Sequence, residues 1–224
     1  MEVYIPVIPL WIALALFFGY AVGNLQFAYF LGKIIGRIDI REHGSGTAGM
    51  TNVMRVMGAK AGLAVLVLDV SKTIFAIFVT NRFLMYLGWD LSINMLGMEY
   101  FYGMLTGLGV ILGHNFPFYL KFKGGKGVAS SISLALMFDW RVLVITLIIA
   151  IIILIITKYM SAASLVGFAA FAITTTVLFS DIKIVLIAWI IAVLGYFTHR
   201  KNIARLLTGT ESKFAPKWEK NSTD

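Results

Sequence analysis

The sequence predicts an all-α polytopic integral membrane protein of about seven transmembrane helices, and three observations carry this prediction. Of its 224 residues, 59% are hydrophobic and only 13% are charged, with a mean hydropathy of +0.87. A soluble domain carries about 25% charged residues to solvate its surface, so this composition excludes a water-soluble globule. The hydrophobic residues fall into long runs, and Lys and Arg gather between alternate runs.

Seven apolar runs are candidates for spanning helices, because crossing a hydrocarbon core of ~30 Å takes roughly 17–25 helical residues. The first run is too long for the core of a signal peptide and follows no basic segment, which indicates a retained helix. The third and fourth runs are short for full crossings. In chain order, the runs cover residues 3–22, 61–80, 100–113, 128–138, 142–157, 162–179 and 184–198.

Charge placement predicts the orientation, because Lys and Arg accumulate in cytoplasmic loops. With seven alternating crossings, one side of the membrane holds 15 of the 19 Lys and Arg residues and the other side holds three. This asymmetry predicts an N-terminus outside and a C-terminus in the cytoplasm. Residues 1–213 are expected to form a single transmembrane domain, followed by a polar tail over residues 214–224.

The composition also restricts the chemistry. The chain has no cysteine and only three histidines, which excludes thiolate chemistry and leaves little for a metal centre, so no metal or cofactor is expected. The net charge of +8 is clustered, which argues against a nucleic-acid surface, and no obligate protein partner is evident. Within the second run, Asp69 and Lys72 are three residues apart and can pair on one helix face, in a functional or a structural role.

A first polar segment, residues 42–55, reads E-H-G-S-G-T-A-G-M-T-N-V-M-R. Its glycines match the G-x-G-x-x-G pattern of dinucleotide sites, but such a site needs a preceding strand, and here a membrane helix precedes it. Small residues allow a close approach of the backbone, and Asn52 and Arg55 can then reach an anionic group. The segment therefore indicates an anion site.

A second polar segment, residues 113–130, places Lys126 among Gly124, Gly125 and Gly127. Successive glycines let consecutive N–H groups face one concavity, which favours an anion nest, and a helix starting near Val128 adds its positive end. The segment is not a Walker loop, since a glycine follows the lysine. A basic loop that binds lipid headgroups explains neighbouring lysines such as Lys123 but not the glycines.

A third polar segment covers residues 199–213. On a helix, Asn202 and Arg205 are three residues apart and share a face, and Gly209 is a plausible helix stop. An amphipathic basic helix on the membrane surface is the alternative interpretation of this segment taken alone.

Together, the stretches G-S-G-x-x-G-x-T-N-x-x-R, G-H-N-F-P-x-x-L-K-F-K-G-G-K-G-V-A and H-R-x-N-I-x-R-L-x-x-G-T-E resemble the acyl-phosphate:glycerol-3-phosphate acyltransferase family, PlsY. The resemblance covers most of the chain. It implies a seven-helix enzyme of the bacterial plasma membrane with its active site on the cytoplasmic face. Such an enzyme moves a fatty acyl group from acyl phosphate to the 1-position hydroxyl of glycerol 3-phosphate, giving 1-acyl-glycerol 3-phosphate and phosphate for phospholipid synthesis.

The resemblance also implies roles for individual residues. Ser45, Arg55, His199 and Asn202 are the expected catalytic residues. The expected substrate-binding residues are Gly46, Thr51, Asn52, Lys123, Gly124, Gly125, Lys126, Gly127, Arg205 and Glu211. Because acyl phosphate is already activated, positioning and neutralising two phosphates should supply most of the catalysis.

The base for the attacking hydroxyl is either His199 or the departing phosphate, and the phosphate is favoured because no carboxylate lies near His199 in sequence. A less favoured alternative makes Ser45 an acylated nucleophile with His43 as its base.

The chain departs from the family pattern at Thr47, Ala48, Met50 and Thr73. These departures leave open a diverged paralogue that uses another phosphorylated acceptor. A non-catalytic transporter of phosphorylated lipids is the alternative from another class. It is disfavoured because no internal repeat is visible and the glycines lie at the membrane edge.

Overall fold

The computed structural model describes residues 9–87 and 98–214, and its regular elements within these ranges are helices. Three helical turns, η1 (Gly32–Gly36), η2 (Ile40–Glu42) and η3 (Phe118–Leu120), lie in the connections. The helices are α1 (Pro9–Gly23), α2 (Phe27–Leu31), α3 (Met50–Met57), α4 (Ala59–Tyr86), α5 (Met98–Asn115), α6 (Val128–Phe138), α7 (Trp140–Thr157), α8 (Met160–Leu178), α9 (Ile182–Thr198) and α10 (Arg200–Leu207).

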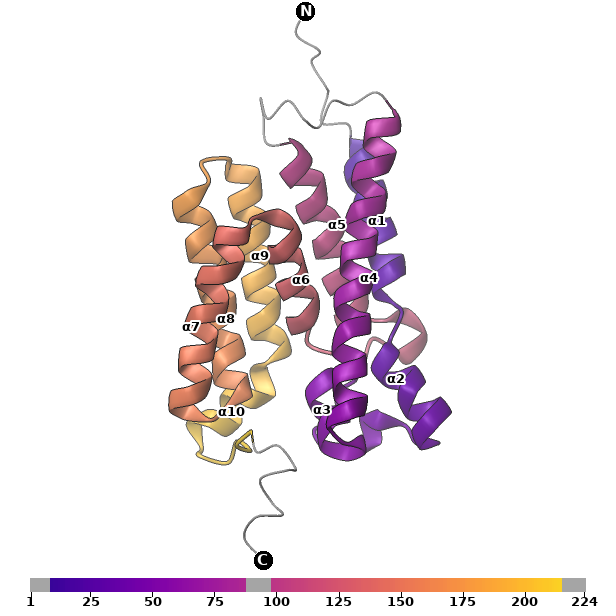
Figure 1. The fold of residues 1–224 in the computed structure, drawn as a ribbon, viewed down its shortest axis with the longest axis vertical. Helices are drawn as coiled ribbons and strands as arrows, with labels where there is room; N and C mark the ends of the chain where they lie inside the picture. Colours follow the sequence, from indigo (N-terminus) through magenta and orange to yellow (C-terminus); the bar gives the residue numbers. More distant parts are fainter. Residues whose placement is uncertain (1–8, 88–97, 215–224) are drawn as a thin grey trace, which may run out of the picture.

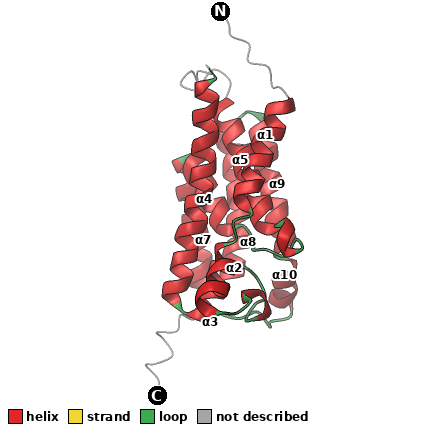
Figure 2. Cartoon of the chain, turned by 90° about the vertical axis from the view of Figure 1, so that its right-hand side faces the viewer, coloured by secondary structure: helices red, strands yellow, loops and turns green. Residues whose placement is uncertain are grey.

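The long helices run roughly side by side, with α1, α4 and α5 forming one half of the bundle and α6 to α9 the other (Figure 1). The short helices α2, α3 and α10 lie together at one end, which we call the lower end (Figures 1 and 2). The three polar segments singled out in the sequence lie in the lower half of the bundle: the first and third include α3 and α10, and the second leads from the end of α5 into α6 (Figure 1). The prediction that they share one face of the protein is therefore consistent with the fold.

Over its described residues, each of the seven predicted runs lies in a helix, but the count of seven crossings is not confirmed. Within the described residues, the stretch Pro9–Gly36 and helices α4, α7 and α8 are long and apolar enough to cross a membrane. Helices α9 and α10 make a fifth candidate if they count as one span with a 60° bend. The 11 residues of α6 rise only ~16 Å, about half of a ~30 Å core. Residues 3–8 of the first run and residues 215–224 of the expected tail lie outside the described residues.

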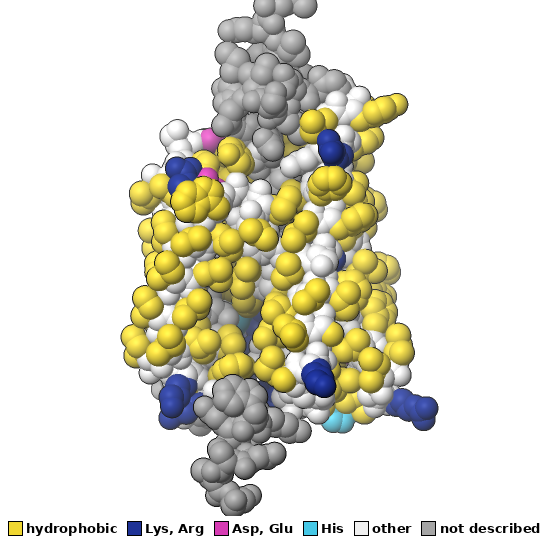
Figure 3. Space-filling view, viewed as in Figure 1, with side chains coloured by type: hydrophobic (Ala, Val, Ile, Leu, Met, Phe, Trp, Pro, Cys, Tyr) yellow, Lys and Arg dark blue, Asp and Glu magenta, His cyan; other side chains and the backbone are white. Residues whose placement is uncertain are grey.

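The outer surface of the bundle is apolar over its middle. Hydrophobic side chains cover the centre of the face in Figure 3, and Lys and Arg side chains lie toward its two ends. Large apolar side chains such as Phe17, Ile156 and Val193 are at least 65% exposed. An apolar belt of this extent identifies a multi-pass membrane protein, because in water it would be an aggregation surface.

Helices α1 and α5 approach closely through glycines four residues apart on each helix. A Cβ atom added at Gly19, Gly23, Gly109 or Gly113 would collide with backbone atoms of the opposite helix. Small residues at this spacing let helix backbones come together in a membrane, where apolar burial alone does not drive association. This contact fixes the lower end of α5, from which the second polar segment begins.

Candidate functional site

The first polar segment is organised by the amide side chain of Asn52, which is only 1% exposed. Its Nδ2 donates to the carbonyl oxygens of His43 and Thr47 at 3.0 Å, and its Oδ1 accepts the backbone N–H of Ser45 at 2.7 Å. Both polar atoms are thus engaged within the loop. Asn52, expected to bind substrate, is placed where it supports the loop.

The open side of this loop carries the hydroxyl groups of Ser45 and Thr47, whose oxygens lie 3.0 Å apart. Ser45 and Gly46 are exposed, and Arg55 is exposed on α3 while Thr51 is half-buried there. His43 Nδ1 lies 3.0 Å from the carbonyl oxygen of Asp39. The contacts of Ser45 and His43 thus give no support to a nucleophile–base pair formed by these two residues.

The backbone of the second polar segment does not form the anion nest that its glycines predict. The N–H groups of Gly124 and Gly125 donate to the carbonyl oxygens of Asn115 and His114, at 3.2 and 3.0 Å. A Cβ atom at Gly125 would collide with the imidazole of His114. These two glycines therefore close the loop back onto α5, and their amides are not open to an anion. The sequence pattern could not reveal this, because the acceptors belong to the end of the preceding helix.

The first turn of α6 takes the place of that nest. Gly127 precedes α6 with φ +77°, a conformation that favours glycine, and no side chain caps the helix. A Cβ atom there would lie 2.9 Å from Oδ1 of Asn115. The first N–H groups of a helix have no intrahelical partner and form a positive end, so this turn can bind an anion beside Lys126.

Two contacts join the second segment to the first segment and to Arg41, the residue that precedes it. The backbone N–H of Ala48 donates to the carbonyl oxygen of Gly124 at 3.3 Å. Arg41 donates to the carbonyl oxygen of Leu120 at 3.1 Å and forms an ion pair with Asp39 at 2.7 Å. The hydrogen bond from Arg41 lowers the pKa of Asp39 to about 2. Lys123 lies exposed on the same loop.

The third segment meets the second at Lys126. Its ammonium donates to Oδ1 of Asn202 at 2.8 Å, and Nδ2 of Asn202 donates to Glu211 at 2.7 Å. Glu211 also accepts from Ser161 at 2.7 Å and pairs with Arg205 at 2.6 Å. Burial alone would raise the pKa of Glu211, but the hydrogen bonds from these three partners lower it. Glu211 and Arg205 therefore hold Asn202 in place.

The charge of Lys126 links all three segments. Burial lowers the pKa of Lys126 to about 8, with Glu211 opposing this shift and Arg205 and Arg55 adding to it. The electrostatic effect of Arg55 shows that α3 contributes to the same local field as α10. A bound anion stabilises a half-buried ammonium more than it stabilises one in water, because the anion replaces the solvation that burial removes.

His199 follows the last residue of α9 and is 2% exposed. Its Nδ1 lies 2.8 Å from the carbonyl oxygen of Gly195, and its ring contacts Phe168 edge-on at 5.9 Å between centroids. Burial, together with the charge of Lys126, lowers the pKa of His199 to about 4. The imidazole is therefore neutral near pH 7, donates from Nδ1 and is a weak base.

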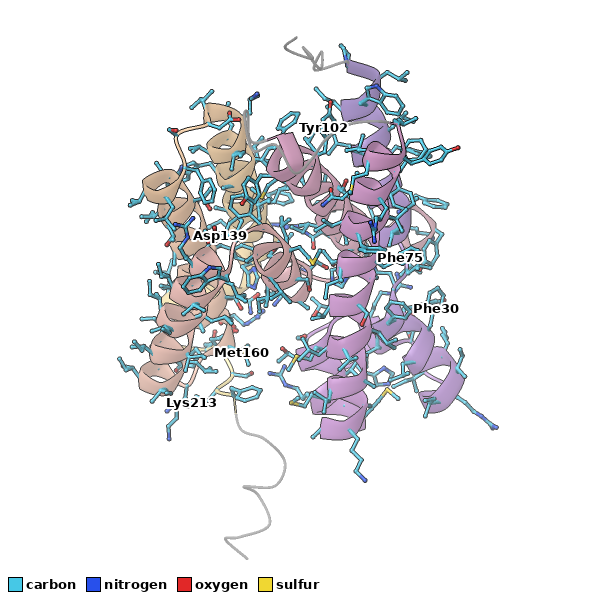
Figure 4. The ribbon with its side chains drawn as sticks, turned by 45° about the horizontal axis from the view of Figure 1, so that its top comes forward. Phe30, Phe75, Tyr102, Asp139, Met160 and Lys213 are labelled. Carbon is cyan, nitrogen blue, oxygen red and sulfur yellow. The ribbon has the colours of Figure 1, made fainter. Side chains whose placement is uncertain are left out.

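An apolar cavity opens between α6, α7 and α8, and the space inside it and in front of its opening is about 720 Å³. Val128 and Ile132 from α6, Leu147 and Leu154 from α7, and Met160 and Phe168 from α8 form much of its wall. Val128 directly follows Gly127, and Phe168 contacts His199, so the cavity adjoins the cationic site. Met160 lies toward the lower end, as Lys213 does, whereas Asp139 and Tyr102 lie toward the other end (Figure 4). The arrangement suits a ligand with an anionic head and an apolar tail.

The predicted pairing of Asp69 and Lys72 is confirmed, and this ion pair is buried inside the bundle, next to the residues of the site. The ammonium of Lys72 lies 2.7 Å from Asp69 and 3.0 Å from Nδ1 of His114, and donates to the carbonyl oxygen of Leu25 at 2.7 Å. His114 in turn contacts Gly125. We call Asp69, Lys72 and His114 the buried triad. The position of His114 within the second polar segment was the available signal for its role. Ser161, the partner of Glu211, lies outside all three polar segments.

Within residues 9–87 and 98–214, no group of three or more His, Asp or Glu side chains could hold a metal ion. The chemistry that these residues offer is the recognition of anions by a lysine, a helix N-terminus and neighbouring arginines, next to an apolar cavity.

Comparison with known proteins agrees with this geometry. A family model described as glycerol-3-phosphate acyltransferase matches residues 13–209. A glycerol-3-phosphate acyltransferase of Thermoanaerobacter pseudethanolicus is 38% identical over 200 residues, covering 89% of this chain and 94% of the relative. A crystal structure of PlsY, an integral membrane glycerol 3-phosphate acyltransferase, in its glycerol 3-phosphate form is similar with a TM-score of 0.79 at 29% identity, covering 91% and 96% of the two chains. Its lysophosphatidic acid form gives a TM-score of 0.76 at 29% identity, covering 91% and 95%.

Proposed function

This chain belongs to the glycerol-3-phosphate acyltransferase family, and we propose that it takes the acyl group from acyl phosphate and places it on the sn-1 hydroxyl of glycerol 3-phosphate. The enzyme is a multi-pass membrane acyltransferase. One observation carries the finer proposal: the Lys126–Asn202 contact lies beside an apolar cavity that suits a fatty acyl chain.

The phosphate of glycerol 3-phosphate binds Lys126 and the first turn of α6 in this proposal. A phosphate at a helix N-terminus gains from both the unpaired N–H groups and the helix dipole. Asn202 orients the ammonium of Lys126 toward this phosphate. The Ser45 hydroxyl and Arg55, on the opposite segment, bind the phosphate of the donor and polarise the acyl carbonyl.

The acyl chain of the donor occupies the cavity between α6, α7 and α8. The sn-1 hydroxyl oxygen attacks the acyl carbonyl carbon, and the bond between that carbon and the phosphate oxygen breaks. The hydroxyl proton passes to the departing phosphate, which leaves as inorganic phosphate. We favour the phosphate as base because His199 has a pKa of about 4 and its Nδ1 is held by Gly195.

A diverged paralogue with another phosphorylated acceptor is the second candidate, and Thr47 is the observation that favours it. Its hydroxyl lies 3.0 Å from the hydroxyl of Ser45, on the open side of the loop. Because Ser45 lies at the acyl carbonyl in this proposal, a side chain beside it is close to the attacking hydroxyl of the acceptor and can select among acceptors. Met50 packs against the buried cluster that contains Ile40 and Val53, and Thr73 is buried on α4 with its hydroxyl donating to the carbonyl oxygen of Asp69, so both side chains have contacts within the protein.

The lower end of the bundle faces the cytoplasm in this proposal, with the N-terminus outside, the C-terminus inside and seven helices traversing a bacterial plasma membrane. The concentration of Lys and Arg on the segments of the lower end supports this orientation. A cytoplasmic site has direct access to water-soluble glycerol 3-phosphate.

Acyl transfer by purified protein in lipid tests the proposed function. Hexadecanoyl phosphate and hexadecanoyl-CoA are each supplied with labelled glycerol 3-phosphate, and the labelled product is identified by mass and by its site of acylation. We expect 1-acyl-glycerol 3-phosphate from the phosphate donor only. Equal transfer from the thioester, or acylation at the second hydroxyl, would refute the proposed donor or position. A series of other phosphorylated acceptors tests the second candidate.

A further inference from the structure

Gly167 is a glycine of α8 that helix packing does not require. A Cβ atom at Gly19 or Gly109 would collide with the backbone of a neighbouring helix, and one at Gly195 would meet the ring of Phe168 at 2.5 Å. At Gly167 the nearest atom to such a Cβ is the Cβ of Ala150, at an ordinary contact distance of 3.5 Å. Glycine is less favourable than alanine inside a helix, so a glycine at this position must serve some purpose other than helix packing.

The cavity supplies that reason, because Gly167 and Ala150 both line it. The lining on α8 extends from Met160, near the cationic site, to Phe171. At a rise of 1.5 Å per residue, this path is ~16 Å long, and Gly167 lies ~10 Å along it. A side chain at position 167 would therefore enter the cavity partway along the lining that α8 contributes.

We propose that Gly167, facing Ala150, determines the length of the acyl chain that the enzyme accepts. This inference rests on the proposed function, since it assumes that the acyl chain occupies this cavity. A long chain passes alongside these two small residues of the cavity wall toward Phe171 and Leu143. A short chain ends before reaching them. Gly167 is thus a specificity-determining residue for the acyl donor.

The test compares Gly167→Leu, Gly167→Ala and Ala169→Leu with the unchanged protein. Ala169 is a half-buried residue of the same helix that does not line the cavity, so Ala169→Leu adds the same bulk elsewhere. kcat/KM is measured with octanoyl and hexadecanoyl phosphate. For Gly167→Leu, we expect a loss of about fiftyfold with the hexadecanoyl donor, as when roughly three methylenes no longer fit, and little change with the octanoyl donor.

Gly167→Ala should give an intermediate loss, and it guards against misfolding of the leucine variant because its added methyl group meets no close contact. Ala169→Leu should keep the original preference. An unchanged ratio between the two donors in both Gly167 variants would overturn the inference, as would an equal loss with both donors.

A second measurement separates this inference from the choice of donor. Thermal stabilisation of each protein by 1-octanoyl- and 1-hexadecanoyl-glycerol 3-phosphate reports acyl-chain binding without any donor. Gly167→Leu should lose the extra stabilisation given by the longer chain. If it does while no acyl phosphate is used, the proposed donor fails and the role of Gly167 stands. If the longer chain stabilises the leucine variant as it does the unchanged protein, the role of Gly167 fails.

Discussion

The ammonium of Lys126 lies 2.8 Å from the amide oxygen of Asn202, although 76 residues separate them in the sequence. Asn202 is itself held by Glu211, which also accepts from Ser161 and pairs with Arg205. The start of α6 is thereby tied to α10 through a chain of charged and polar groups. This arrangement buries a cation beside a helix N-terminus, and its consequences can be measured.

The first prediction concerns pH. Because the pKa of Lys126 is lowered to about 8, the free enzyme loses this positive charge as the pH rises through 8, and kcat/KM for glycerol 3-phosphate should then fall. Bound phosphate favours the charged form, so kcat should stay flatter. In Lys126→Arg, the guanidinium stays protonated, and the fall should disappear whatever the absolute rate. The same fall in both proteins would contradict this assignment.

The second prediction concerns Glu211. Glu211→Ala leaves Asn202 and Arg205 without their shared acceptor, and a lost hydrogen bond to a charged group costs about 1.5–3 kcal/mol. We expect KM for glycerol 3-phosphate to rise by about tenfold or more, since Asn202 would no longer hold Lys126 in place. Glu42→Ala, which removes an exposed carboxylate from the first segment, is the matched control and should leave KM unchanged. Equal effects of the two variants would exclude the positioning role.

The third prediction concerns the buried triad. Asp69→Asn or Lys72→Met alone leaves an uncompensated buried charge, which destabilises a protein by about 3–5 kcal/mol. The double variant removes both charges and should recover much of the thermal stability in detergent. His114 approaches both residues, so the double variant is also expected to shift KM for glycerol 3-phosphate through Gly125. Additive losses of stability would contradict the pairing.

The fourth prediction concerns membrane orientation. The chain has no cysteine, so single cysteines can be introduced and labelled selectively. Ser180→Cys, in the exposed turn between α8 and α9, should react with a membrane-impermeant maleimide in intact cells. Lys201→Cys, exposed on α10, should react only after the membrane is opened. The reverse labelling pattern would invert the proposed topology.

The sequence predicted the positions of the long helices well, and their ends less well. Helices α7 and α9 begin two residues before the predicted runs because Asp139 and Asp181 cap them, accepting the N–H groups of Arg141 and Lys183. Helix α4 continues six residues beyond the predicted end at residue 80. Asn81 and Arg82 interrupt the apolar pattern but not the backbone hydrogen bonding. Hydropathy therefore located the runs, whereas capping groups set the boundaries.

The site was predictable as three segments but not as individual contacts. Glycine and lysine patterns identified the second segment, yet the amides of Gly124 and Gly125 bond to the end of α5. Asn52 and Glu211 have residue types suited to ligands, and both are engaged within the protein. Such partners come from distant parts of the chain, and no local pattern encodes them. The apolar cavity likewise forms only when three helices pack together.

The central claim is that Lys126 binds the phosphate of glycerol 3-phosphate, and a direct binding measurement tests it. Calorimetric titration of glycerol 3-phosphate into purified protein, without any acyl donor, gives Kd for the unchanged chain, Lys126→Met and Lys121→Met. Lys121 is an exposed lysine of the same loop and serves as the control. Lys126→Met is predicted to weaken binding by about tenfold or more, with Lys121→Met close to the unchanged protein. Equal affinity of Lys126→Met and the unchanged protein would contradict the claim.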